Sequence, residues 1–221
     1  MTLLALGDSF TYGEELANQH LSWPYLLGQR MGPNVVNLAK PAASNDSIVR
    51  RLLEYIIAQQ DPVDLVVIGW SMLGRQEFAD DVGYYSIWPG YSGNLFQQDR
   101  SVWRQDLVKY FNQYHNRQHY HVRYLEQVIL VQNFLKSRNI KYVMMNVLEN
   151  EYYRRSPMFH WQPYFAEIDK DYFMGFNHSG MVEWTDAAKC PKGPNGHFLE
   201  QGHELVADKV YEHIRNLGWI S

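Results

Sequence analysis

Short apolar runs alternate with amphipathic stretches along much of the chain. The runs are rich in Leu, Val and Ile without polar interruption, as in parallel strands that are buried on both faces. The stretches between them repeat apolar residues at the spacing of a helix with one buried face. This alternation predicts an α/β protein with helices on both faces of a mainly parallel sheet. The expected strands are Leu3–Leu6, Val35–Leu38, Asp64–Gly69 and Lys141–Val147, and the expected helices are Trp23–Met31, Asp46–Gln59, Tyr120–Ser137 and His203–Leu217.

The predicted helices and crossovers also indicate where a site should lie. Right-handed crossovers place the loops that follow the strands along one edge of the sheet, where α/β proteins bind their ligands. Candidate chemistry is therefore expected directly after a strand.

In the helix expected at Asp46–Gln59, the side chains assigned to the buried face are Ile48, Leu52, Leu53, Ile56 and Ile57.

Two stretches depart from this alternation, at about 74–119 and 149–196. Both are rich in Tyr, Trp, Phe, Gly and Pro, and we interpret them as aromatic-rich insertions beside the site. The first is expected to contain a helix around Val102–Tyr114. The length of 221 residues suits one large α/β domain, so a single domain is expected over 1–221.

Charge and cysteine content narrow the function classes. The formal net charge of −4 argues against a nucleic-acid-binding face, which would need clustered Lys and Arg. No basic leader, cleavable apolar segment or run long enough to span a bilayer is present. Cys190 is the one cysteine, which is compatible with a reducing compartment. A soluble, cytoplasmic protein with no membrane partner is expected, and its oligomeric state stays open.

The first candidate chemistry follows the first strand directly, at Gly7-Asp8-Ser9-Phe10-Thr11-Tyr12-Gly13. A turn at the end of a strand exposes a hydroxyl while its backbone N–H points into the same cavity. The segment resembles the Gly-Asp-Ser block of the SGNH (GDSL-like) hydrolase family. That resemblance implies a flavodoxin-like, three-layer α/β/α sandwich with Ser9 as nucleophile. Asp8 is expected to cap the turn or the helix that follows.

A second block lies near the C-terminus, at Pro194-Asn195-Gly196-His197-Phe198, and is followed by Gln201-Gly202-His203. It is similar to the family's fifth block, Asp-x-x-His with a Gly-His pair six residues later, which makes His197 the candidate base. His203 is expected to pack or to cap a helix. Pro194 stands where the family has its aspartate, so the group that orients the imidazole is open. A Ser-His dyad, a backbone carbonyl, or a carboxylate from another loop such as Asp186 are the alternatives.

The remaining blocks concern the oxyanion. Ala42 or Ala43 stands near the place of the second block's glycine and can donate its N–H if its φ is negative, while Ser44 is expected to cap the next helix. The third block, Gly-x-Asn-Asp in the family, is Gly69-Trp70-Ser71-Met72 here. The expected oxyanion donors are Ser9, Ala42, Ser71 and Asn45, the expected substrate-binding residues are Trp70 and Arg75, and Arg75 is also expected to pair with Glu77.

The resemblance implies an ester hydrolase that needs no metal or organic cofactor. Ser9 would attack the ester carbonyl while His197 takes its proton, giving an acyl-enzyme. A small acyl group and a sugar or other small-molecule ester are favoured, because Tyr and Trp side chains suit stacking against a sugar ring. One alternative is a non-catalytic hydrolase-like module that binds a glycan or a protein, which the altered third and fifth blocks favour. A subunit of a larger assembly, such as a virus particle, is a further alternative.

Overall fold

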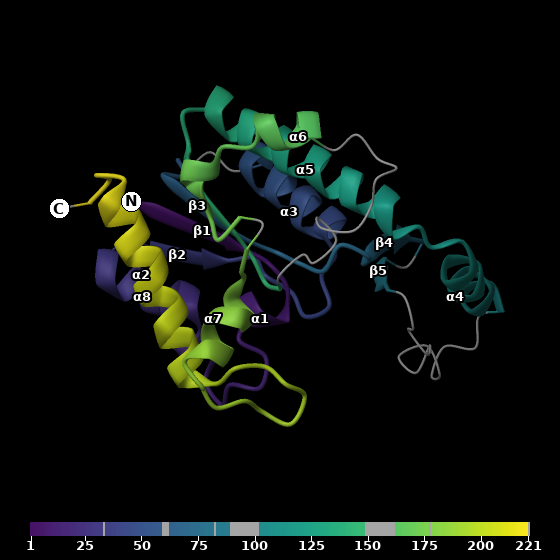
Figure 1. Cartoon of the computed structure of the whole chain (residues 1–221), viewed down its shortest axis with the longest axis horizontal. Helices are drawn as coiled ribbons and strands as arrows, with labels where there is room; N and C mark the ends of the chain where they lie inside the picture. Colours follow the sequence, from purple (N-terminus) through teal and green to yellow (C-terminus); the bar gives the residue numbers. More distant parts are fainter. Residues whose placement is uncertain are drawn as a thin grey trace.

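The computed structural model describes residues 1–32, 34–58, 62–81, 83–88, 102–148, 162–176 and 178–220. Five strands form a parallel sheet in the order β2-β1-β3-β6-β7 (Figure 1). This is the flavodoxin-like order, in which the first strand lies second from one edge. The predicted α/β class and parallel sheet are confirmed. The strands are β1 (Thr2–Leu6), β2 (Asn34–Asn37), β3 (Leu65–Trp70), β6 (Lys141–Asn146) and β7 (Phe173–Met174).

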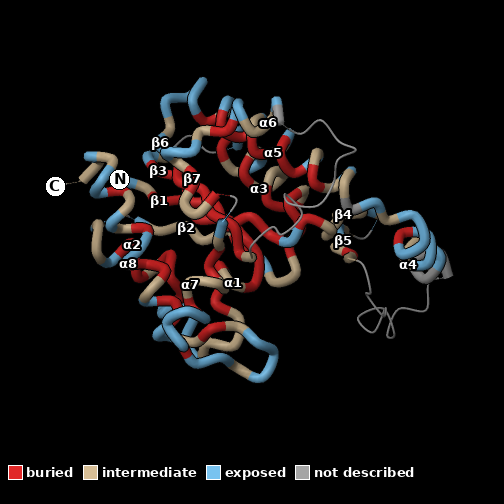
Figure 2. The backbone as a smooth tube through the Cα atoms, in the orientation of Figure 1, coloured by how far each residue is buried: buried red, intermediate tan, exposed pale blue. Residues whose placement is uncertain are grey.

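Helices cover both faces of this sheet, and alternate side chains of each strand point to opposite layers. In β1, Leu4 and Leu6 pack into one apolar cluster, while Leu3 and Ala5 pack into the other. Figure 2 shows the strands as the most buried part of the backbone, between two sets of helices. Since both faces are covered, the strands are continuously apolar. One layer contains α3 (Asn45–Ala58), α5 (Arg117–Ser137) and α6 (Gln162–Glu167), and the other contains α2 (Trp23–Met31), α7 (Met181–Ala187) and α8 (Glu200–Asn216).

The helix α3 shows where the predicted buried face was too wide. Ile48, Leu52 and Ile56 are buried, but Ile57 is 67% exposed. Residues four apart stay on one side of a helix, whereas the next residue is rotated by about 100°. The assignment of Ile57 to the buried face is therefore wrong.

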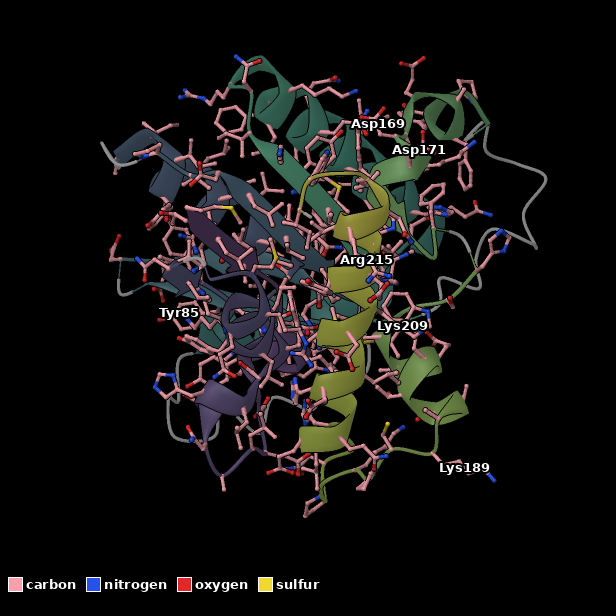
Figure 3. All side chains as sticks on the ribbon, turned by 90° about the vertical axis from the view of Figure 1, so that its left-hand side faces the viewer. Tyr85, Asp169, Asp171, Lys189, Lys209 and Arg215 are labelled. Carbon is pink, nitrogen blue, oxygen red and sulfur yellow. The ribbon has the colours of Figure 1, made fainter. Side chains whose placement is uncertain are left out.

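The helix α8 shows the same division between an apolar and a polar face. Val206, Val210 and Ile214 are buried against the sheet. Figure 3 looks onto this helix from outside, where Lys209 and Arg215 are exposed. In the described parts of the chain, no helix is both long and apolar enough to cross a membrane.

The two stretches predicted as insertions differ from each other. In the first, β4 (Gln76–Ala79) and β5 (Tyr84–Ile87) form an antiparallel pair, and α4 (Val102–Tyr114) lies beside them, away from the helices on the sheet (Figure 1). Phe78, Ile87 and Phe111 join these elements in a small apolar cluster. The second stretch includes β7, so part of it completes the sheet. Residues 89–101 and 149–161, which belong to the predicted insertions, lie outside the described residues.

Candidate active site

Ser9 begins α1 (Ser9–Tyr12), a single helical turn that follows β1 directly. The side chain of Asp8 caps this turn, because its Oδ1 accepts the N–H of Phe10 at 3.1 Å. The turn ends at Gly13, which has a φ of 90° and so adopts a left-handed conformation that glycine reaches without strain. The predicted capping role of Asp8 is confirmed. The hydroxyl of Ser9 is thereby held at the carboxyl end of the sheet, where α/β proteins bind ligands.

The backbone N–H groups of Ser9 and Ala42 are among those near this turn that have no acceptor among the described residues. The N–H of Ala43 is engaged with Lys40 O at 3.0 Å, so Ala42 is the available donor of the pair. Ala42 has a φ of 60°, so the negative φ on which its role as donor was made conditional is not observed; its N–H is nonetheless unengaged among the described residues. The left-handed region costs a non-glycine residue about 1–2 kcal/mol, and such strain gathers at functional sites. Unengaged N–H groups of this kind can receive the charge of an oxyanion.

Ser71 and Asn45, the other expected oxyanion donors, instead brace the loops. Ser71 Oγ donates to Asp8 Oδ2 at 2.7 Å, so its proton is already engaged by a buried carboxylate. Asn45 holds the backbone of Ser71 at both ends, with Oδ1 accepting Ser71 N–H at 2.8 Å and Nδ2 donating to Ser71 O at 3.2 Å. Both side chains therefore fix the position of Asp8, next to Ser9.

Arg75 joins the loops that follow β1, β2 and β3. Its Nη1 lies 3.4 Å from Asp8 Oδ2, 3.1 Å from Ala43 O and 3.0 Å from Ser71 Oγ. Desolvation lowers the pKa of Arg75, and the nearby Asp8 carboxylate opposes this effect. The guanidinium therefore makes its hydrogen bonds within the protein, which does not favour the expected role of Arg75 in binding substrate.

The expected Arg75–Glu77 pair is wrong, and the position of Trp70 does not favour its expected role. Glu77 pairs with Arg50, at 2.8 Å between Oε2 and Nε, and not with Arg75. Trp70 is wholly buried beneath the helices, edge-on to Tyr124 with ring centroids 5.9 Å apart. Because its side chain has no exposed surface, this position does not favour the expected role of Trp70 in binding substrate.

The loop that carries His197 lies against α1. The imidazole packs on the ring of Phe10, the residue after Ser9, with centroids 4.6 Å apart. Its Nδ1 is 2.8 Å from Oε2 of Glu15, and its Nε2 is 3.6 Å from Oε2 of Glu14. No hydrogen bond joins Ser9 Oγ to His197 among the described residues; in unliganded sites such contacts often form only with substrate.

Glu15 is the partner of His197 that the sequence interpretation missed. Its carboxylate also accepts the N–H of Asn195 at 2.8 Å and the N–H of His197 at 3.1 Å. The expected candidate, Asp186, pairs with Lys192 at 2.6 Å instead. The available signal was a pair of carboxylates directly after the Gly-Asp-Ser block, at Glu14 and Glu15.

Two capping predictions beside the site are confirmed. His203 is buried, and its Nδ1 accepts the N–H of Trp23 at 3.2 Å, at the start of α2. Burial lowers the pKa of His203 to about 3, so this imidazole is neutral. Ser44 Oγ accepts the N–H of Ser47 at 3.2 Å and caps α3. Within the described ranges, no three His, Cys, Asp or Glu side chains are placed to hold a metal ion.

Solved structures with this fold include several esterases. The psychrotrophic esterase EstA from Pseudoalteromonas sp. is 17% identical, with a TM-score of 0.53 over 98% of this chain and 97% of that one. TesA is 14% identical, with a TM-score of 0.54 over 98% and 99% of the two chains. The acetyl xylan esterase Est2A from Butyrivibrio proteoclasticus is 12% identical, with a TM-score of 0.51 over 99% of this chain and 65% of that one. At these identities the likeness establishes the fold, which is the one that the SGNH resemblance implied.

Sequence comparison adds a family but no activity. No curated protein matches the chain. Residues 11–221 match a described family, and this range includes Glu15, Ala42 and His197. The chain belongs to a family of unknown function (DUF6071).

Proposed function

We propose that this protein is a serine ester hydrolase that acts on small acyl groups, with Ser9 as nucleophile and His197 as general base. The observation that supports the proposal is the packing of His197 on Phe10, the residue that follows Ser9 in the chain. Because Nδ1 is engaged by Glu15, Nε2 is the nitrogen left to take a proton. The esterase names of solved structures with the same fold support the reaction class.

The chemistry follows from these groups. Ser9 Oγ attacks the ester carbonyl carbon while its proton moves to Nε2 of His197. The N–H groups of Ser9 and Ala42 stabilise the oxyanion of the tetrahedral intermediate. When the intermediate collapses, the ester C–O bond breaks and the alcohol leaves with the proton from His197. Water then attacks the acyl-enzyme while its proton moves to His197, the bond between the acyl carbon and Ser9 Oγ breaks, and His197 returns the proton to Oγ as the acid leaves.

An acetylated glycan is the substrate class that we propose. On α4, Tyr110 and Tyr114 are largely exposed, with ring centroids 4.7 Å apart. Exposed aromatic rings of this kind suit stacking against the apolar face of a sugar; because α4 lies apart from α1 (Figure 1), they support glycan binding by the protein and not direct contact with the ester at Ser9. One solved structure with this fold is named as an acetyl xylan esterase, which is consistent with a sugar ester.

The test is covalent labelling with a fluorophosphonate probe, followed by mass spectrometry to locate the adduct, together with hydrolysis of p-nitrophenyl acetate. Wild-type protein should be labelled at Ser9. Ser9→Ala should lose labelling and about 10³-fold or more of the hydrolysis rate, because the nucleophile is gone. Ser137→Ala, which removes an exposed hydroxyl on α5, is the matched control and should match wild type.

Both variants should keep the wild-type melting temperature, so that loss of labelling reports on chemistry. Labelling that persists in Ser9→Ala would refute the assignment of the nucleophile. A folded wild-type protein that is neither labelled nor active on short-chain esters would favour the non-catalytic glycan- or protein-binding module.

A further inference from the structure

The carboxylate of Glu15 contacts Nδ1 of His197, the nitrogen that an orienting acid contacts in a Ser-His-acid triad. We propose that Glu15 is the acid that positions His197, so that the nucleophile and the acid come from the same segment after β1. This inference rests on the proposed function for its catalytic meaning. On this proposal the protein still has an orienting acid, Glu15, although its fifth block lacks the aspartate.

Hydrogen bonding fixes the charge and direction of this carboxylate. Its two oxygens accept the N–H groups of Asn195 and His197 and contact Nδ1 of the imidazole. Desolvation acts to raise the pKa of Glu15, but these hydrogen bonds outweigh it and hold the pKa below its ordinary value. An ionised carboxylate only accepts hydrogen bonds, so Nδ1 carries a proton, and in the neutral imidazole Nε2 carries the lone pair. That tautomer is the one a general base needs.

The backbone is shaped to admit this side chain. Glu15 has a φ of 70°, in the left-handed region, which a non-glycine residue enters at a cost. A Cβ on Gly193 would lie 2.6 Å from the carboxyl carbon of Glu15, so a side chain there would displace the carboxylate. Gly193 N–H also donates to His197 O at 2.8 Å and closes the loop. A strained residue on one segment and a glycine on the other thus meet at this contact.

The neighbouring Glu14 is placed differently. Its side chain is 41% exposed and 3.6 Å from Nε2, whereas that of Glu15 is 9% exposed and bonded on both oxygens. Exposed charges are screened and exchange readily with water. Glu15 is therefore the fixed partner of His197, and Glu14 the one that substrate can displace.

The test compares Glu15→Gln with two other variants. Glu15→Gln keeps the size of the side chain but removes its charge, so kcat on p-nitrophenyl acetate should fall about 100-fold or more while KM changes little. Adding Pro194→Asp puts a carboxylate at the family's position and should restore about tenfold or more of the lost kcat. Glu212→Gln, an exposed carboxylate on α8 that pairs with Arg215, is the control and should match wild type.

A second measurement reads the position of the proton directly. Nitrogen NMR of the histidine side chains should show His197 protonated at Nδ1 in the wild type and shifted toward Nε2 protonation in Glu15→Gln. If Glu15→Gln does not fold, Gly193→Ala takes its place, because its Cβ should push the carboxylate away and cause the same two changes.

The outcomes distinguish the positioning role of Glu15 from the proposed esterase function. An active wild type with a Glu15→Gln variant of equal kcat, or a variant that loses kcat while the His197 tautomer is unchanged, would overturn the role of Glu15. A wild type that is unlabelled and inactive, yet shows a tautomer that depends on Glu15, would overturn the proposed function and leave the positioning role standing.

Discussion

Arg75→Ala tests whether the loops around Ser9 are held together by one buried cation. The side chain of Arg75 is 12% exposed and that of Asp8 is 2% exposed, so the substitution leaves a carboxylate inside the protein without its cation. Ala43 O and Ser71 Oγ lose a charged donor at the same time. Breaking a buried ion pair by removing one partner costs about 3–5 kcal/mol, much of it from the stranded charge.

That loss should be visible in the unfolding transition. For a chain of this size, each kcal/mol corresponds to about 2–4 °C, so the melting temperature should fall by roughly 6–20 °C. Urea unfolding at pH 7, followed by tryptophan fluorescence, gives the free energy directly. Arg30→Ala is the matched control, because Arg30 pairs with Glu204 and Asp208 at the surface of α8 and should cost no more than about 1 kcal/mol.

Coupling between the two residues separates the ion pair from simple loss of packing. Asp8→Asn removes the charge that Arg75 neutralises, so in the Asp8→Asn background Arg75→Ala should cost about 1–3 kcal/mol less than in the wild type. Two results would contradict the inference that a buried Arg75–Asp8 ion pair holds these loops together. One is an Arg75→Ala variant that is destabilised no more than Arg30→Ala, and the other is strict additivity of Arg75→Ala and Asp8→Asn.

Two further predictions concern stability alone. On α3, Leu52→Ala removes a side chain with no exposed surface and should lower the free energy of unfolding in urea by about 2–5 kcal/mol. Ile57→Ala, on the exposed face, should lower it by less than about 1 kcal/mol. Equal losses would contradict the assignment of the buried face of this helix. Because desolvation lowers the pKa of His203 to about 3 from 6.5, the unfolded chain binds a proton that the folded one excludes, and the stability present above pH 6.5 is lost as the pH falls. By pH 5 this group should remove about 2 kcal/mol, and His203→Asn should show a shallower decline between pH 7 and pH 5 than the wild type.

The sequence was sufficient to predict the helices and strands that are several residues long and carry a clear hydrophobic pattern of their own. The strand β3 is continuously apolar and α2 has a clear amphipathic pattern, so both were found near their observed bounds. The two-residue strand β7 is too short to show any periodicity, and it was therefore assigned to an insertion.

The candidate site was predicted only in part, for a different reason. Ser9 and His197 lie in recognisable blocks, whereas the contact of Glu15 with Asn195 spans 180 positions and depends on how the loop 193–197 folds. The roles of Ser71 and Arg75 likewise depend on which atoms reach Asp8, which no spacing along the chain reveals.

The pairing of α8 with α2 has a consequence for the order in which the protein acquires structure. The helix α8 follows the His197 loop, and its His203 caps α2, whose Trp23 and Leu27 lie in the same buried cluster. During synthesis, at about 5–20 residues per second, that cluster stays open until α8 has left the ribosome. A chain cut before Glu200 would expose Trp23 and Leu27 and release the loop that carries His197. Proteolysis at that point should therefore remove stability and the candidate site in a single event.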